Sequence, residues 1–444
     1  MKTTLLLITG ALLLHSQGLS AQQQNPEPCG QVEYQRQLEM QHPGFKDQMD
    51  RVYRMAADYA NGVSLRKTVV PDTVFTIPVV FHVLYNVAAE NIHDSLIYSQ
   101  LFALNRDFRK RNADTSSIRN LFKPRASDTK IQFVMATKDP SGKPTTGINR
   151  VSTTKATFGS FNLTDDMKFA SRGGTDAWNT SKYLNIWVCD LSVQNVDALL
   201  GYAYPPYDAP NWNSGSFPPS PDHEGVVLHY KIVGINNPRA TGSLANSRNG
   251  RTAVHEVGHY LGLRHIWGDP PNGVSGCTVD DGIDDTPLCA SQSNFDCNKS
   301  RNTCNTGAGD EPDQVENYMD YSSHTCQTMF SKKQMNIMRF CLVNFRSNLY
   351  QAEITRDTVI SGIRLFPNPS VDGIITVEIE PFMLSQHQYS LTLTDMNGRV
   401  VLDATPCNQM SQRIDLSRFS RGTYYAELRD EQGTIVIREK LLRF

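Results

Sequence analysis

The chain has 444 residues, which is too many for one ordinary domain, so two or three folded units are expected. A hydrophobic content of 39% and a charged content of 20% are typical of a soluble protein. The formal net charge of −2 gives no overall attraction to nucleic acid or to an anionic membrane. Composition therefore excludes charge-driven binding to either, and the function must be read from local motifs.

The N-terminus has the composition of a secretory signal peptide. One early lysine is followed by a short apolar run and by small residues that end near Ala21. The run is too short and too weakly flanked for a membrane anchor, and no other stretch is apolar enough to span a bilayer. We expect residues 1–21 to be removed and the protein to be secreted, in a compartment that permits disulfides.

The next elements predict an α/β core. Residues 22–67 are polar, then amphipathic and helical, with no core of their own. Beyond them, the pattern predicts a buried strand, a helix, further strands, and then a helix that carries a histidine motif. The expected strands cover residues 73–85, 131–137, 183–191 and 225–233, and the expected helix covers 94–111. This order favours an α/β catalytic domain over residues 68–350, with an irregular last third.

After residue 355 the pattern changes to short alternating strands separated by Asn-Gly and Gln-Gly turns. This pattern predicts a separate all-β, sandwich-like domain over residues 358–444.

Five of the nine cysteines lie between Cys277 and Cys326, in a segment rich in Asp, Asn, Gly and Ser. Such a segment has few apolar side chains to hold it together, so we expect disulfides there. The total is odd, so at least one thiol must have another role. The sequence leaves open the partners of four cysteines: Cys189, Cys289, Cys341 and Cys407.

The stretch "RTAVHEVGHYLGLRHIWGD" carries the chemistry. His255 and His259 are four residues apart, so on a helix they share one face. Gly262 can end that helix in a left-handed conformation, after which His265 can return to supply a third nitrogen. Three histidines and one open position form a catalytic zinc site, and Glu256 is placed to act as general base and then as acid for the departing amine.

The competing interpretation of this stretch is an ordinary buried helix that contains histidines. A bare H-E-x-x-H is a weak pattern. Here five specified positions match in register, which arises by chance in well under roughly one chain in a thousand. The extended pattern therefore favours the metal site.

The full motif, H-E-x-x-H-x-x-G-x-x-H, is that of the metzincins, and Met319 in "ENYMDYSSHTC" resembles their Met-turn. Among the metzincin families, residues 68–345 resemble the pappalysins. The resemblance rests on "FTIPVVFHVLY", "GRTAVHEVGHYLGLRHIWGD", "DDGIDDTP", "ENYMDYSSHTC" and "MFSKKQMNIMR". It implies a zincin-like metzincin fold and a zinc endopeptidase that acts on proteins or peptides.

The resemblance also implies roles for further residues. Tyr321 would polarise the scissile carbonyl, although a core-packing tyrosine is the alternative. The family pattern implies two disulfides, Cys277–Cys304 and Cys297–Cys326, with Cys289 as a competing partner. The acidic loop at 279–287 would bind calcium rather than remain a solvated loop. The candidate calcium ligands are Asp280, Asp281, Ile283 through its carbonyl, and Thr286.

Cys29, in "PCGQ", resembles the cysteine switch of bacterial relatives, with a free thiol as the alternative. A pro-segment over residues 22–67 would then use Cys29 as a zinc ligand and keep the zymogen latent. Activation would require cleavage between this segment and the core. The basic candidates for that cleavage are Arg51, Arg54, Arg66 and Lys67.

Substrate preference is less clear. Relatives that cut beside Arg or Lys carry acidic residues just before the second Met-turn cysteine. Here these positions are Ser323, His324 and Thr325, so a basic preference is doubtful unless an acid elsewhere serves. The substrate would extend along an edge strand, for which residues 225–233 are the candidate.

The C-terminal domain resembles the type A sorting domain of the bacterial type IX secretion system, through "LFPNP", "DMNGRVV" and "GTYYAEL" followed by "KLL". This implies secretion with release or surface attachment. A small adhesive or carbohydrate-binding domain is the alternative. For the whole chain, the competing class is a secreted interaction protein with a structural zinc. Glu256 distinguishes the two classes, because structural zinc needs no general base.

Overall fold

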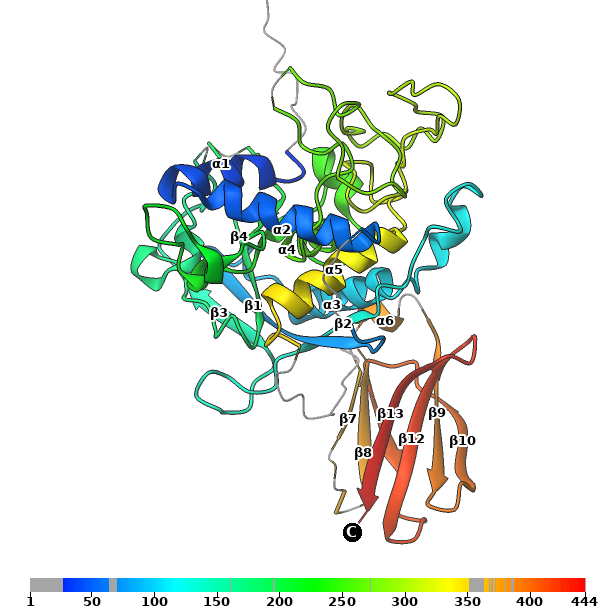
Figure 1. The fold of residues 1–444 in the computed structure, drawn as a ribbon. Coiled ribbons are helices and arrows are strands. Elements are labelled where there is room, and N and C mark those ends of the chain that lie inside the picture. The colour runs from blue at the N-terminus through cyan, green and yellow to red at the C-terminus, as the bar shows by residue number, and fades with distance from the viewer. Residues whose placement is uncertain are drawn as a thin grey trace, which may run out of the picture.

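The computed structural model describes residues 27–63, 70–350 and 363–443, except for 161, 195, 272, 367, 369, 372, 380 and 385–386. The expected signal peptide lies outside the described residues. So do Arg66 and Lys67, and the expected boundary between the two domains. Figure 1 shows a larger α/β unit and a smaller β unit, which carries the C-terminus.

The larger unit is built on one mixed sheet. Its strands are β1 (Phe75–Tyr85), β2 (Ile131–Met135), β3 (Ile148–Ser152), β4 (Leu184–Cys189), β5 (Gly201–Ala203) and β6 (Val226–His229). The order is β2-β1-β4-β6-β5, and β3 pairs with the C-terminal half of β1. All pairs are parallel except β5 with β6.

This order corrects one prediction. Residues 225–233 are not the edge, because β6 lies between β4 and β5. The edge strand is β5, which has only three residues, too few for a recognisable alternating pattern. The last residues of the expected strand instead form a 3-10 turn at Tyr230–Ile232.

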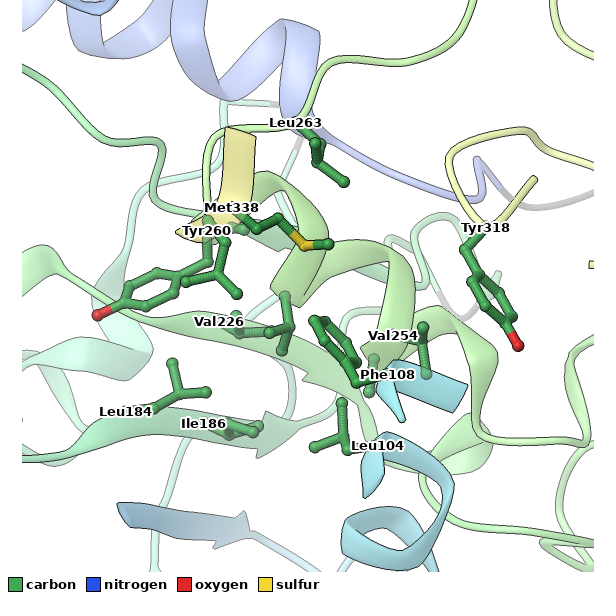
Figure 2. Packing of buried hydrophobic residues seen from close by; sticks show 14 of the residues in the cluster. Leu104, Phe108, Leu184, Ile186, Val226, Val254, Tyr260, Leu263, Tyr318 and Met338 are labelled. Carbon is green, nitrogen blue, oxygen red and sulfur yellow. The ribbon is translucent and has the colours of Figure 1, made fainter. Parts of the chain in front are cut away.

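Three helices cover one face of the sheet: α3 (Asp94–Phe108), α4 (Arg251–Tyr260) and α5 (Lys332–Phe345). Leu184, Ile186 and Val226 of the sheet pack against this layer, together with Leu104, Phe108, Val254 and Met338 (Figure 2). Their burial removes a continuous apolar surface from water, which is the main stabilising term. The core thereby holds α4 rigidly against β5 and β6.

The region expected to be a pro-segment forms two helices, α1 (Gln31–Gln41) and α2 (Phe45–Ala60). One side of α2 packs on α5, where Tyr59 and Phe340 stack with ring centroids 5.0 Å apart. Further residues of α1 and α2 pack on the face of the sheet opposite α4, in a cluster that includes Tyr34, Phe45 and Tyr202. Both helices thus bury their apolar side chains against the catalytic domain.

The smaller unit is an all-β sandwich, as predicted. Its two sheets have the orders β10-β9-β12-β13 and β11-β8-β7. The elements are β7 (Ile363–Phe366), β8 (Ile374–Ile379), α6 (Pro381–Leu384), β9 (Tyr389–Asp395), β10 (Val400–Pro406), β11 (Ser411–Asp415), β12 (Gly422–Asp430) and β13 (Ile435–Arg443). Inward residues of both sheets form its core, and Phe102 of α3 packs against that core.

Between α4 and α5 the chain has little regular structure, as the composition predicted. Two disulfides cross-link this part, Cys277–Cys304 and Cys297–Cys326. The five other cysteines are buried and unpaired: Cys29, Cys189, Cys289, Cys341 and Cys407. None of the described helices is long and apolar enough to cross a membrane.

Candidate metal centre and active site

Helix α4 positions three of the chemical groups. His255, Glu256 and His259 lie on it and are buried. The helix ends before Gly262, which has a φ of 94°. A Cβ at this position would lie 2.5 Å from the Cys341 Sγ, so both the backbone conformation and the space require glycine. The turn at Gly262 brings His265 back to face the helix.

The three imidazoles converge on one point. The Nε2 atom of His255 lies 3.1 Å from that of His259 and 3.2 Å from that of His265, and the last two are 3.1 Å apart. A tetrahedral zinc site with Zn–N bonds of about 2.0–2.1 Å places its nitrogens roughly 3.3 Å apart. The observed spacing therefore fits zinc.

Each imidazole is oriented through its other nitrogen. Nδ1 of His255 donates to the Tyr318 carbonyl at 2.7 Å, and Nδ1 of His259 donates to the Leu263 carbonyl at 2.8 Å. Nδ1 of His265 lies 2.5 Å from a carboxylate oxygen of Asp269. These partners place the protons on Nδ1 and leave the Nε2 lone pairs free for a metal. Burial also lowers the pKa of His255 and His259 well below its usual range, which favours the neutral, ligating form.

Sequence reasoning did not assign a role to Asp269 or to Trp267, whose ring stacks on His265 with centroids 4.3 Å apart. The available signal was the position of both residues within "HIWGD", directly after the third histidine. An acidic residue four positions after a metal-binding histidine is within reach of its Nδ1.

Cys29 completes the set of ligand atoms. Its Sγ and the three histidine nitrogens all lie within 4.8 Å of one another, and all four residues are buried. The thiol also lies 3.4 Å from Oε2 of Glu256. Among the described residues, no hydrogen-bond partner faces the other oxygen of Glu256, and burial raises the pKa of this carboxyl well above its usual range. A thiol therefore occupies the position beside Glu256 that a water molecule would need.

Met319 and Tyr321 flank the same centre. Met319 is fully buried beneath α4, and a Cβ at Gly258 would lie 2.6 Å from its sulfur. The glycine in the middle of the histidine motif thus makes room for the methionine. The Tyr321 hydroxyl donates to the Cys29 carbonyl at 3.0 Å. It already binds a main-chain carbonyl at the metal centre, which is the contact expected of a group that polarises a scissile carbonyl.

The segment around Cys29 runs along the edge of the sheet. Glu27 and Leu199 form a parallel bridge, and the Gly30 N–H donates to the Gly201 carbonyl at 2.8 Å. The Ala203 N–H donates to the side-chain oxygen of Gln31 at 3.2 Å. The outward-facing hydrogen-bonding groups of β5 are therefore occupied.

A small pocket opens beside the three histidines. Its lining residues are Pro28, Leu200, Ser247, Arg251, Thr252, His255, Phe295, Asp320, Tyr321, Ser322, His324 and Gln327. Of Ser323, His324 and Thr325, only His324 lines it. Burial and the nearby Arg251 guanidinium lower the pKa of His324 to about 3, so this imidazole is neutral. Asp320 is the carboxyl of the pocket, and burial raises its pKa to about 6.

In the acidic loop, the structure brings together three of the four calcium candidates. The Thr286 hydroxyl lies 2.8 and 2.9 Å from the two carboxylate oxygens of Asp281, and 3.1 Å from the Ile283 carbonyl. Asp281 is buried, which raises its pKa well above the usual range, and the charges of Asp280 and Asp285 raise it further. Asp280 is exposed and accepts from the Gly282 N–H instead.

Both parts of the chain are similar to known proteins. Residues 235–343 match the family model described as "Pregnancy-associated plasma protein-A", and residues 364–442 match the "Secretion system C-terminal sorting domain". The chain is also similar to a promirolysin variant of Tannerella forsythia, with 35% identity and a TM-score of 0.60, covering 73% of this chain and 97% of that one. The chain belongs to the pappalysin family of metallopeptidases. It carries a sorting domain for secretion at its C-terminus.

Two further similarities bear on this pappalysin. Mature mirolysin of Tannerella forsythia in complex with a cleaved peptide is 39% identical, with a TM-score of 0.55, over 63% of this chain and 97% of that one. An extracellular metalloprotease of Colletotrichum graminicola is 35% identical over 184 residues, which are 41% of this chain. The chain spans 55% of the length of that relative, about half.

Proposed function

We propose that the chain is a secreted, zinc-dependent endopeptidase made in a latent form. The observation that carries this proposal is the convergence of three imidazoles beside Glu256, with the Cys29 thiol in the fourth position. A zinc ion held by His255, His259 and His265 would supply Lewis-acid polarisation of a peptide carbonyl and would acidify water. The extracellular metalloprotease and the mirolysin–peptide complex among its relatives support this activity.

The residues of the chain would perform the remaining chemistry. Glu256 takes a proton from the attacking water and passes it to the departing amine. A buried carboxyl with a raised pKa holds that proton more readily than an exposed one. Tyr321 donates its hydroxyl hydrogen bond to the scissile carbonyl, in place of the Cys29 carbonyl that it binds here. The substrate main chain pairs with Gly201 and Ala203 at the free edge of β5.

Residues 27–31 would keep the enzyme latent, because they occupy the groups that a substrate would need. Cys29 takes the fourth ligand position, its carbonyl engages Tyr321, and Gly30 and Gln31 cover the edge of β5. Activation would therefore require removal of residues 22–67. Arg51 and Arg54 lie within α2, where a protease would first have to unwind the helix. Arg66 and Lys67, which follow α2 in the sequence, are thus the better candidates.

One observation favours the competing class. Cys29 makes the ligand set a closed group of four, and structural zinc sites are closed. A secreted interaction protein would retain such a site permanently. It would have no use for the buried carboxylate of Glu256 next to the ligands, where an unpaired charge is costly. Glu256 therefore favours the peptidase.

The test is digestion of a peptide library by the matured protein, followed by sequencing of the cut ends. We expect cleavage at internal peptide bonds, its loss after a chelator removes the metal, and its return with added zinc. The amino acids enriched after the cut would report the preference of the Asp320 pocket. A matured protein that retains zinc but cuts no peptide would support the structural-zinc class.

We also propose a calcium ion in the loop, held by Asp281, the Ile283 carbonyl and Thr286. A buried carboxylate beside further acidic groups is destabilising unless a cation compensates it. Saturating calcium is expected to raise the melting temperature by about 5 °C, since a ligand that binds only the folded state stabilises it by mass action. Asp281→Asn should remove this response.

The matched control is Asp284→Asn, which changes an exposed acid in the same loop. It should retain the calcium response in the same thermal melts. A native protein whose melting temperature does not change with calcium would contradict the proposal.

For secretion, we propose that residues 358–444 address the chain to the type IX machinery. The sorting-domain match over residues 364–442 supports this partner. Release into the medium or attachment at the cell surface would follow.

A further inference from the structure

Tyr34 of α1 occupies a site made entirely by the catalytic domain. Its hydroxyl donates to Oδ2 of Asp165 at 2.5 Å and accepts from the Lys168 ammonium at 3.0 Å. Its ring lies 4.7 Å from that of Tyr202 and 6.1 Å from that of Tyr204, measured between centroids. The side chain is 1% exposed. We call the receiving group, Asp165, Lys168, Tyr202, Tyr204 and His223, the tyrosine site.

The charges of the tyrosine site are compensated without Tyr34. Asp165 and Lys168 form an ion pair at 3.0 Å through Oδ1 of Asp165, and Tyr202 donates to this same oxygen at 2.8 Å. Lys168 also donates to the His223 carbonyl at 2.9 Å. Burial raises the pKa of the Asp165 carboxyl, but Lys168 and His223 lower it more strongly. The resulting pKa is about 2. The site therefore keeps its charges paired when the pro-segment leaves.

The site lies next to the expected position of a substrate. Gly201 is close to the catalytic carboxyl, because a Cβ on it would lie 3.1 Å from Cγ of Glu256. Tyr202 is the next residue of β5 and faces the opposite side of the sheet, in the cluster that contains Tyr34. Residues directly opposite each other on paired strands share a face. A substrate residue paired opposite Tyr202 would thus direct its side chain toward the tyrosine site.

The direction of the substrate decides which side of the cut this residue is on. The Cys29 segment runs parallel to β5. A substrate can instead pair with β5 in the antiparallel direction, which is the more stable pairing per residue. In that arrangement, the residues before the scissile bond lie beside Tyr202 and Tyr204. Since extended chains advance about 3.3 Å per residue, the relevant position is roughly two or three residues before the cut.

We propose that removal of the pro-segment converts the tyrosine site into a substrate subsite that selects a tyrosine side chain on the N-terminal side of the scissile bond. This inference rests on the proposed endopeptidase function. A phenol hydroxyl donates to Asp165 and accepts from Lys168 at once, whereas phenylalanine leaves both groups without that partner. Tyr34 is the occupant that the zymogen supplies in place of the substrate.

The experiment uses the matured protein and peptides that differ at one residue, placed two or three positions before a known cut site. We expect kcat/KM for the tyrosine peptide to exceed that for the phenylalanine peptide by about 10-fold or more. In the double variant Asp165→Asn/Lys168→Met, this ratio should fall to near one. The ratio is taken within one enzyme, so a loss of folded protein cancels.

Three outcomes are distinguishable. Equal kcat/KM for the tyrosine and phenylalanine peptides in the native protein would overturn the subsite while leaving the endopeptidase intact. A tyrosine preference that persists in the double variant would place the selection elsewhere and also overturn it. Absence of cleavage of every peptide would instead count against the proposed function. The comparison in the native protein requires no variant, so it holds even if the double variant does not fold.

Discussion

Glutamine in place of Glu256 is expected to lower kcat/KM of the matured protein by about 10²- to 10⁴-fold, which is the range of a lost general base. Glutamine has nearly the same shape but cannot take the proton of the attacking water. The three histidines and their Nδ1 partners are unchanged, so the zinc content should remain one per chain. Peptide hydrolysis and metal analysis on the same preparation check both parts.

The matched control for Glu256→Gln is Glu90→Gln. Glu90 is also a buried carboxylate, and it accepts a hydrogen bond from the Asn86 N–H, far from the metal centre in the sequence. This control should retain activity. If the Glu256 variant cut peptides at the native rate, Glu256 would not be the general base and the proposed mechanism would be wrong.

Replacement of Cys29 by serine is expected to raise the rate of pro-segment removal by about 10-fold or more. A neutral hydroxyl is a much weaker zinc ligand than a thiolate, so the fourth position opens to water. The main-chain bonds of Gly30 and the contact of Tyr34 with Asp165 remain, so latency should be weakened rather than abolished. The measurement is the time course of chain shortening on a gel, with peptide hydrolysis followed in parallel.

Cys407→Ser provides the control for this variant, because Cys407 is a buried free thiol in the C-terminal domain. It should mature at the native rate. Unchanged latency in Cys29→Ser would show that the thiol does not inhibit the enzyme. The pairing of residues 27–31 with β5 would then be the cause of the latency.

The convergence of the three histidines could be predicted from the sequence because its geometry is local. His255 and His259 share a helix face through the 3.6-residue period, and Gly262 reverses the chain within a few residues. The α/β and all-β organisation was predictable for the same reason, since alternating and helical patterns are read over short windows. Cys29, Met319 and Tyr321 were named through the family resemblance, and the structure places them around the histidines.

The identity of the edge strand could not be predicted from such local patterns. Strand order depends on pairings between distant segments, and a three-residue strand such as β5 carries no usable pattern. The longer apolar run at 225–233 was therefore mistaken for the edge. The support of His265 by Asp269 was likewise not predicted, although Asp269 follows His265 by only four residues.

The sequence by itself determined the expected metal site of this protein, because the candidate ligands and their spacing lie within eleven residues of one helix and turn. Only the tertiary structure decided how the centre is closed and which side chain occupies the neighbouring site. Cys29 reaches Glu256 across 227 positions, and Tyr34 reaches Asp165 across 131. Contacts at such separation follow from how the sheet and its covering helices pack together, which no local pattern contains.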